Sequence, residues 1–533
     1  MARAAGGHAD HVIVIGAGMA GLAACLRLLS GGRQVTLIEG ANYSGGKMRQ
    51  VSTSLGPVDS GPTVFTMRSV FEELLAGVNR RLDEVVRVQP LELLARHAWD
   101  EAGCLDLYAD RQRSADAIAA FAGPREAEGY LNFCAQAGRI FDLLEPAMLR
   151  APRPTPLSLS WRARSAGLSG LLGLQPFTNM WKALQKHFQD PRLQQLFGRY
   201  ATYCGSSPWR APATLMLIAH LEQEGVWQLD GGMQSLAAGL AGVARQCGVS
   251  LIEGEWVEEL CTARGRVSGV RTSSGREIAG DAVVCTADLG ALRAGLLGEA
   301  ARKSVPTRAR QRSLSAVTWS MAAQTEGFPL AYHSVFFSSD YKREFDALFD
   351  RGEIPLQPTV YVCAQDRLPQ DRLPLSSLTP QQRTPKASEA LASGERLFCL
   401  ANAPAIGDRH HFTDEEIAAC QRSMFTRLRE CGLQVKPLDA PVVRTPTDFA
   451  TRFPGSGGAI YGQATHGWLS AFQRPGSRSR VPGLFLAGGG VHPGAGVPMV
   501  TLSGMLAADA ALSAQGLTPR LWPAATAGGT SMR

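Results

Sequence analysis

The chain of 533 residues is long enough to bury a large core and should form at least two domains. Apolar residues make up 45% of it and its net charge is +7, which fits a globular protein weakly attracted to anionic membranes and argues against a nucleic-acid partner. Its 11 cysteines occur singly and its histidines lack ligand spacing, so we expect a reducing compartment, no disulfide framework and no metal site.

The chain opens with a dinucleotide-binding fingerprint. Residues 11–15 form a short β-branched run that predicts a parallel strand buried on both faces. Gly16 then allows a tight turn, Gly18 lets the backbone approach a pyrophosphate, and Gly21 lets the next helix, 19–30, pack closely against the strand. The free amides and the dipole of that helix would face the phosphates.

Glu39 indicates which nucleotide is bound. A second predicted strand, 34–38, ends at this acid, at the spacing where a carboxylate accepts both ribose hydroxyls. A carboxylate there favours a free ribose and argues against NADP. The glycine spacing also argues against reading the apolar stretch 12–29 as a membrane span, and the leader 1–10 lacks the apolar core of a signal peptide.

The middle of the chain mixes helical and strand-like segments. Helical patterns dominate from 70 to 223. The next predicted elements are a helix at 235–247, a strand at 250–253, short strands around Val257, 267–272 and Ile278, and strands at 281–287, 317–321 and 359–363. The segment 368–395 and the tail 513–533 lack periodicity, so we expect a mobile loop and a flexible end.

A second glycine-rich turn lies near the C-terminus. A strand-like run ends at Leu486, the glycines Gly488, Gly489 and Gly490 follow, and a helix containing Pro498 comes next. This order offers a second helix N-terminus to the same ligand. A ligand held by both ends of the chain indicates a flavin enzyme, with the intervening chain building the substrate site.

These motifs resemble those of the bacterial-type carotenoid desaturases, relatives of phytoene desaturase, over residues 11–512. The shared pieces are the three fingerprint glycines, Glu39, and the runs 45–49, 59–67, 230–233 and 486–498. Within that family the chain is most similar to the hydroxycarotenoid 3,4-desaturases, or methoxyneurosporene dehydrogenases, of purple photosynthetic bacteria, at residues 97–100, 359–367 and 465–468. The segment 368–395 looks longer than this family leads us to expect and indicates a surface insertion.

The resemblance implies an α/β fold with a two-dinucleotide-binding (GR2-like), Rossmann-type FAD domain that is discontinuous in sequence. An α+β substrate domain and a helical membrane-facing segment would complete it. The expected parts are FAD-binding segments at 9–70, 226–300 and 456–512, a helical substrate and membrane-facing part at 71–225, a substrate domain at 301–455 and the tail 513–533.

The expected cofactor is FAD, and the residues agree with it. Gly45 and Gly46 would offer backbone amides to phosphate, and Lys47 or Arg49 would supply positive charge. The alternative for both cations is a solvated loop charge. Gly488, Gly489 and Gly490 would face the second phosphate or the ribityl chain, and the helix from Pro498 would continue beside the flavin ring.

The expected substrate is a long acyclic 1-hydroxy- or 1-methoxycarotenoid, oxidised at its 3,4 bond, with a quinone or O₂ accepting the electrons. Hydride loss from the allylic carbon and proton loss from its neighbour would form the double bond, which demands orientation more than a strong base. Asp59, in the turn-rich segment 56–63, is the candidate catalytic group. Its alternative role is that of a turn-forming aspartate.

An insoluble substrate requires contact with a bilayer. Residues 161–188 place Leu, Phe and Trp beside Arg and Lys, a pattern typical of interfacial segments. The alternative is a buried pair of lid helices. We therefore expect a cytoplasmic protein, peripherally bound to the inner or photosynthetic membrane.

Rival functions share the fold. A phytoene desaturase and a carotene isomerase are alternatives within the family, and a non-redox, lipid-carrying prenyl-Rab escort protein is the alternative from another class. The intact Glu39 and the turn 488–490 argue against the escort protein. An amine oxidase commonly links the flavin to a C-terminal cysteine, and no cysteine follows Cys431.

Overall fold

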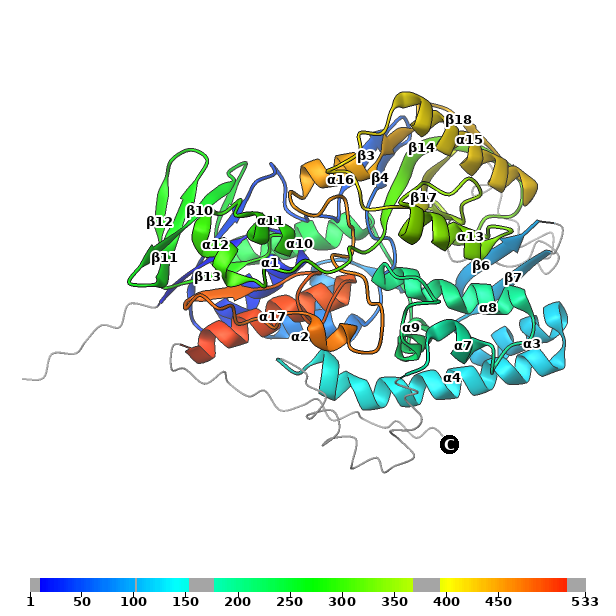
Figure 1. Cartoon of the computed structure of the whole chain (residues 1–533), viewed down its shortest axis with the longest axis horizontal. Coiled ribbons are helices and arrows are strands. Elements are labelled where there is room, and N and C mark those ends of the chain that lie inside the picture. The colour runs from blue at the N-terminus through cyan, green and yellow to red at the C-terminus, as the bar shows by residue number, and fades with distance from the viewer. Residues whose placement is uncertain (1–9, 101–102, 153–176, 368–393, 515–533) are drawn as a thin grey trace, which may run out of the picture.

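A computed structural model describes residues 10–100, 103–152, 177–367 and 394–514. Figure 1 shows two bodies joined side by side, a parallel sheet with helices and a small β-meander on the left, and a mixed sheet with helices on the right. Residues 368–393 of the predicted loop 368–395 lie outside the described residues. Its last residue, Glu395, is the first residue of β17. Residues 515–533 of the predicted tail lie outside as well.

The parallel sheet is built from both ends of the chain and its middle. Its strands are β1 (His11–Ile15), β2 (Gln34–Glu39), β9 (Ser250–Glu253), β13 (Ala282–Cys285) and β20 (Leu484–Leu486), in the spatial order β20-β13-β1-β2-β9. Alternate strand residues such as Val12 and Ile13 enter two different hydrophobic clusters, one on each face. The sheet is therefore buried on both sides, as the unbroken β-branched run predicted.

Helices cover one face of this sheet. They are α1 (Met19–Ser30), α2 (Arg68–Ala76), α10 (Met233–Gln246) and α17 (Val497–Ala514). The other face packs against the meander β10 (Val257–Ala263), β11 (Arg266–Thr272) and β12 (Glu277–Ala279), together with α11 (Leu289–Ala294) and α12 (Gly298–Ser304). The predicted strand at 11–15 and helix at 19–30 are confirmed residue for residue.

The first and last helices pack directly on each other. A side chain at Gly504 of α17 would collide with the Ala20 carbonyl of α1, so glycine is needed for this close crossing. Arg27 and Asp509 add an ion pair of 2.7 Å between the same two helices. By length and composition α17 is the one described helix that could cross a membrane, but two thirds of it is buried, as in the core helix of a folded domain.

The mixed sheet forms the second body. It contains β6 (Leu93–Trp99), β7 (Gly103–Tyr108), β14 (Ser315–Gly327), β15 (His333–Phe336), β16 (Val360–Ala364), β17 (Glu395–Ala403), β18 (Leu433–Pro437) and β19 (Val442–Arg444). Helix α15 (Asp414–Glu430) packs on one face through Cys420, Met424 and Leu428. The other face meets α3 (Arg111–Ala122), α4 (Pro124–Leu144), α7 (Met180–Leu184), α8 (Pro191–Gly198) and α9 (Leu217–Gln223).

The expectation that 71–225 is helical is wrong for residues 88–108. Residues 88–108 form β5 (Val88–Pro90), β6 and β7, and the last two extend the mixed sheet. The remaining elements are β3 (Gln50–Thr53), β4 (Gly56–Asp59), β8 (Trp227–Leu229), α13 (Tyr341–Asp346), α16 (Pro446–Arg452) and the short helical turns η1 (Leu82–Glu84), η2 (Glu145–Leu149), η4 (Arg199–Cys204), η5 (Ala213–Met216), η6 (Ala347–Arg351) and η8 (Ser470–Gln473).

Candidate functional site

A cavity of about 540 Å³ opens at the carboxyl edge of the parallel sheet. It is lined by the residues that end or directly follow β1, β2, β13 and β20, among them Gly16, Glu39, Thr286 and Gly488. Ligands of parallel α/β sheets bind at this edge because the loops and helix N-termini converge there. We call this space the cofactor cavity.

The three fingerprint glycines have different surroundings. A side chain at Gly16 would collide with Thr286, and one at Gly21 would collide with the Gly16 carbonyl. At these two positions other protein atoms already occupy the space that a side chain would need. At Gly18 the nearest atom to an added Cβ would be 3.8 Å away, in Gly46. The space over Gly18 is therefore open toward the cavity, as expected where a backbone approaches a ligand phosphate.

Glu39 is held at the cavity wall by backbone amides. Its carboxylate accepts hydrogen bonds from Ala17 N at 2.6 Å and Ala41 N at 2.9 Å. Burial raises the pKa of Glu39, and these amides act against that rise by favouring the charged form. A carboxylate fixed beside the glycine turn is placed to accept hydroxyl groups of a ribose.

The loop at Gly45 and Gly46 docks onto the fingerprint turn. Gly45 N donates to Ala17 O at 2.9 Å, and an added Cβ at Gly46 would lie 3.1 Å from the Gly18 Cα. Both glycines have positive φ, at 133° and 60°, and both line the cofactor cavity. This arrangement brings two sets of backbone amides to one place, where phosphate oxygens could accept from them.

Lys47 and Arg49 line the same cavity, so neither is the solvated loop charge of the alternative prediction. Lys47 Nζ donates to Ile460 O at 2.8 Å, and burial lowers the pKa of Lys47. Arg49 is 4% exposed and burial lowers its pKa to about 10. Its Nε donates to Ser60 O at 3.3 Å, while Nη1 and Nη2 have no hydrogen-bond partner among the described residues. A buried guanidinium with two free donors fits a polar or anionic ligand.

The C-terminal turn completes the opposite wall. Gly488 N donates to Ser503 Oγ at 3.0 Å, and Arg474 Nη1 donates to Gly489 O at 2.7 Å, so helix α17 and a buried arginine hold the turn. Gly488, Gly489 and Gly490 all line the cofactor cavity. Pro498, in the first turn of α17, lies instead on a second cavity.

Asp59 directly precedes Ser60, which lines the cofactor cavity, but Asp59 itself lines neither that cavity nor the second one. Its carboxylate accepts from the backbone amides of Met233 and Gln234, which begin α10. A side chain at Gly232 would collide with it. Asp59 therefore caps a helix, and this placement gives no support to the predicted catalytic role.

Residues that the sequence pattern did not single out complete the cofactor cavity. The Trp256 ring covers Gly40, and Tyr461 and Thr318 come from distant segments. The Thr318 hydroxyl is buried, and no residue in the described part of the chain forms a hydrogen bond with it. Neither spacing nor periodicity marks these positions, because they reach the cavity only through the tertiary fold.

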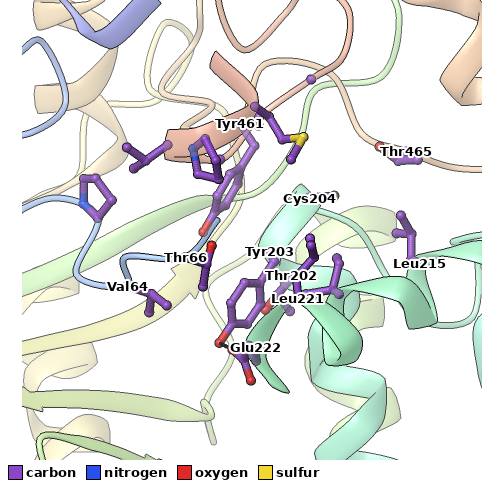
Figure 2. Close-up of a pocket in the computed structure, with 18 of the residues that line it drawn as sticks. Val64, Thr66, Thr202, Tyr203, Cys204, Leu215, Leu221, Glu222, Tyr461 and Thr465 are labelled. Atoms are coloured by element: carbon purple, nitrogen blue, oxygen red, sulfur yellow. Dashed lines mark hydrogen bonds between the residues drawn. The ribbon is translucent and has the colours of Figure 1, made fainter. Parts of the chain in front are cut away.

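A second cavity, of about 320 Å³, adjoins the first. The two share lining residues where they meet: Gly61, Pro62, Phe398, Leu400, Tyr461, Ala495, Gly496 and Val497. Most of its other walls are apolar, with Leu215, Leu217 and Leu221 on one side. Figure 2 labels Tyr461, Val64 and Thr66 among the residues that line it. We call this space the substrate cavity.

The predicted interfacial segment 161–188 is described only from residue 177 onward. Within it, α7 is a core helix, because Met180, Ala183 and Leu184 are fully buried and Trp181 stacks on Trp209 at 4.4 Å. The interfacial reading is therefore wrong for 180–184. Phe177, in contrast, is 80% exposed and contacts the 42% exposed Trp468 ring edge to face at 5.3 Å.

Comparisons with known proteins agree with this geometry. The sequence profile of the flavin containing amine oxidoreductase family matches residues 19–512. The hydroxyneurosporene desaturase of Rubrivivax gelatinosus is 47% identical over 98% of this chain and 97% of its own. That of Cereibacter sphaeroides is 41% identical over 94% and 97%.

Solved structures share the fold at low sequence identity. Cyclohexylamine oxidase from Brevibacterium oxydans has a TM-score of 0.53 and 15% identity, covering 95% of this chain and 99% of its own. An oxidoreductase from Methanosarcina mazei has a TM-score of 0.55 and 14% identity, covering 93% and 99%. Both comparisons support a Rossmann-like parallel sheet joined to a mixed substrate sheet.

Proposed function

The chain belongs to the flavin-containing amine oxidoreductases and uses FAD, and we propose that it desaturates the 3,4 bond of an acyclic 1-hydroxy- or 1-methoxycarotenoid. The finer fold that we propose is the two-dinucleotide-binding (GR2-like) form, with an FAD domain split over three segments. The observation that carries the substrate class is the largely apolar substrate cavity, which runs directly into the cofactor cavity.

Several residues fit FAD in particular. Arg49 and Thr318 have buried donors that no described residue pairs, Gly18 leaves an open approach, and Glu39 can accept from ribose hydroxyls. Lys47 adds positive charge to the same wall. These groups support the expected roles of the fingerprint glycines, the loop 45–49 and the turn 488–490 in binding the cofactor.

When bound, FAD supplies a two-electron oxidant for a carbon–hydrogen bond. The chain supplies position and environment. Gly61, Pro62 and Tyr461 lie at the junction of the cavities, where a polyene would present its reacting bond. Leu217, Leu221 and other apolar side chains exclude water along the rest of the cavity.

The rival functions are distinguishable. A covalent bond between flavin and a C-terminal cysteine, common in amine oxidases, cannot form here, because the sequence has no cysteine after Cys431. A non-redox escort protein does not explain the buried donors of Arg49 and Thr318. Both residues line the cofactor cavity, and the described part of the chain supplies no hydrogen-bond partner for these donors. Phytoene desaturation and carotene isomerisation fit the same cavities and are separated from our proposal by the product.

We also propose that the protein is cytoplasmic and binds the surface of the inner or photosynthetic membrane, with a quinone or O₂ as electron acceptor. The exposed aromatic pair Phe177 and Trp468 supports the membrane contact, since aromatic rings favour the interface of a bilayer. A water-insoluble polyene must enter from such a phase.

The proposal is tested with purified holoprotein, liposomes containing a 1-hydroxycarotenoid, and a soluble quinone. We expect a red shift of the visible spectrum and a product with two hydrogens fewer by mass spectrometry. Phytoene in the same liposomes should remain unchanged. Conversion of phytoene, or an isomer of unchanged mass, would contradict the proposal in favour of one of the two rivals.

A further inference from the structure

Charged and phenolic side chains interrupt the apolar wall of the substrate cavity. Arg199 and Tyr203 come from η4, and Glu222 comes from α9. Figure 2 shows Tyr203 and Glu222 pointing toward each other beside Leu221. The mechanism described above uses none of these groups.

Glu222 is a buried carboxylate with two phenol partners. Tyr200 Oη donates to one of its oxygens at 2.6 Å and Tyr203 Oη donates to the other at 2.6 Å. Burial raises the pKa of Glu222, while the two phenols favour its charged form. Because Tyr203 Oη gives its proton to Glu222, its oxygen remains an acceptor at the cavity surface.

Arg199 is a cation with few partners. Its guanidinium carbon lies 5.5 Å from the ring centres of Tyr203 and Tyr361. Among the described residues it makes one hydrogen bond, from Nη1 to Tyr203 Oη at 3.5 Å, and no ion pair. A guanidinium carries five donors, and an enclosed one is costly unless something accepts from it. The remaining donors are available to a ligand in the cavity.

The cluster lies near the junction with the cofactor cavity. The Arg199 guanidinium lies over the ring of Tyr361, and Tyr361 pairs with Leu400 on the neighbouring strand. Leu400 lines both cavities. In a 1-hydroxycarotenoid a single methylene separates the oxygen-bearing carbon from the 3,4 bond, so the oxygen must also lie near this junction during reaction.

On the premise of the proposed function, we propose that Arg199, Tyr203 and Glu222 form the subsite for the oxygen at C1 of the substrate. Arg199 donates to that oxygen, and the Tyr203–Glu222 pair accepts from the hydroxyl. A methyl ether accepts but cannot donate, so it uses Arg199 alone. This anchor sets which bond of the polyene lies at the junction.

The test compares three carotenoids of equal chain length: the 1-hydroxy compound, its methyl ether and the carotene without oxygen. Arg199→Met should lower kcat/KM on the order of 10- to 100-fold for both oxygenated substrates, the cost of losing a hydrogen bond to a charged group. Its affinity for the plain carotene, read from the perturbed flavin spectrum, should stay at the wild-type value. Tyr203→Phe should lower the affinity for the hydroxy compound more than the affinity for the ether.

Arg199→Lys should restore part of the selectivity, because a lysine keeps a charged donor. Tyr130→Phe is the matched control, since Tyr130 is a buried phenol that does not line the cavity. Equal losses for all three carotenoids, or none, in variants with wild-type flavin content would overturn the subsite. If the wild-type protein converts none of the three carotenoids, the proposed function is refuted instead. The ratios of the affinities of wild type and variant for the three carotenoids then still test the subsite.

Discussion

Replacing Gly18 by alanine should separate cofactor binding from folding. The Gly18 backbone is extended, with φ −71° and ψ 175°, so alanine can adopt it. An added Cβ would have no neighbour nearer than 3.8 Å. Alanine is a poorer helix N-cap but also reduces the entropy of the unfolded chain, and these two effects offset to within about 1 kcal/mol.

The same methyl group would project into the space left for the pyrophosphate. Loss of one charge-assisted hydrogen bond to phosphate costs about 1.5–3 kcal/mol, which corresponds to a rise in Kd for FAD of roughly 10- to 100-fold. We would measure Kd by titrating deflavinated protein with FAD and following flavin fluorescence. Thermal unfolding of the same apoprotein gives the stability.

Two further glycines serve as controls. Gly21→Ala should destabilise the apoprotein itself, because its Cβ collides with the Gly16 carbonyl. Gly242→Ala, where no atom lies within 4 Å of an added Cβ, should change neither quantity adversely. Wild-type affinity for FAD in Gly18→Ala would refute the approach of phosphate to Gly18.

Three other predictions follow from buried or exposed groups. Asp59→Asn should lower the free energy of unfolding by about 1–3 kcal/mol through loss of the charged cap of α10, while turnover per bound flavin stays unchanged; lost turnover at full stability would restore the catalytic role. Burial raises the pKa of Glu344 from 4.5 to about 7, so the folded state holds a proton that the unfolded state has lost, and stability falls as pH rises through this window. Glu344→Gln should reduce this fall, by up to about 3 kcal/mol, in urea unfolding between pH 4 and pH 8; an unchanged slope would contradict the assignment. Serine at Phe177 and Trp468 should weaken co-sedimentation with liposomes roughly 10-fold or more, whereas serine at Leu356, which is 78% exposed, is the control and should have little effect.

The cofactor domain was predictable because its signals are local. The run 11–15, the glycine spacing and Glu39 lie within one βαβ unit, and the structure gives them the expected elements. Strands β6 and β7 were missed because β6 joins the mixed sheet by pairing with the distant β15, and β7 then pairs with β6. Local periodicity does not record such a long-range pairing. The sequence could not show that Asp59 caps α10, because the amides that its carboxylate binds lie more than 170 positions away along the chain.

The substrate site escapes sequence reading for a related reason. Arg199, Glu222 and Tyr361 come from a helical turn, a helix and a strand, and only the packing of the helices on the mixed sheet brings them together. An isolated Arg or Glu in a helical segment is ordinarily a solvated charge. The informative fact is its enclosure in a largely apolar wall, because burying a cation whose donors are not all paired costs free energy that a bound acceptor would offset. The ends of the chain therefore build the cofactor cavity, and the tertiary contacts of its middle build the subsite that we propose to select the reacting bond.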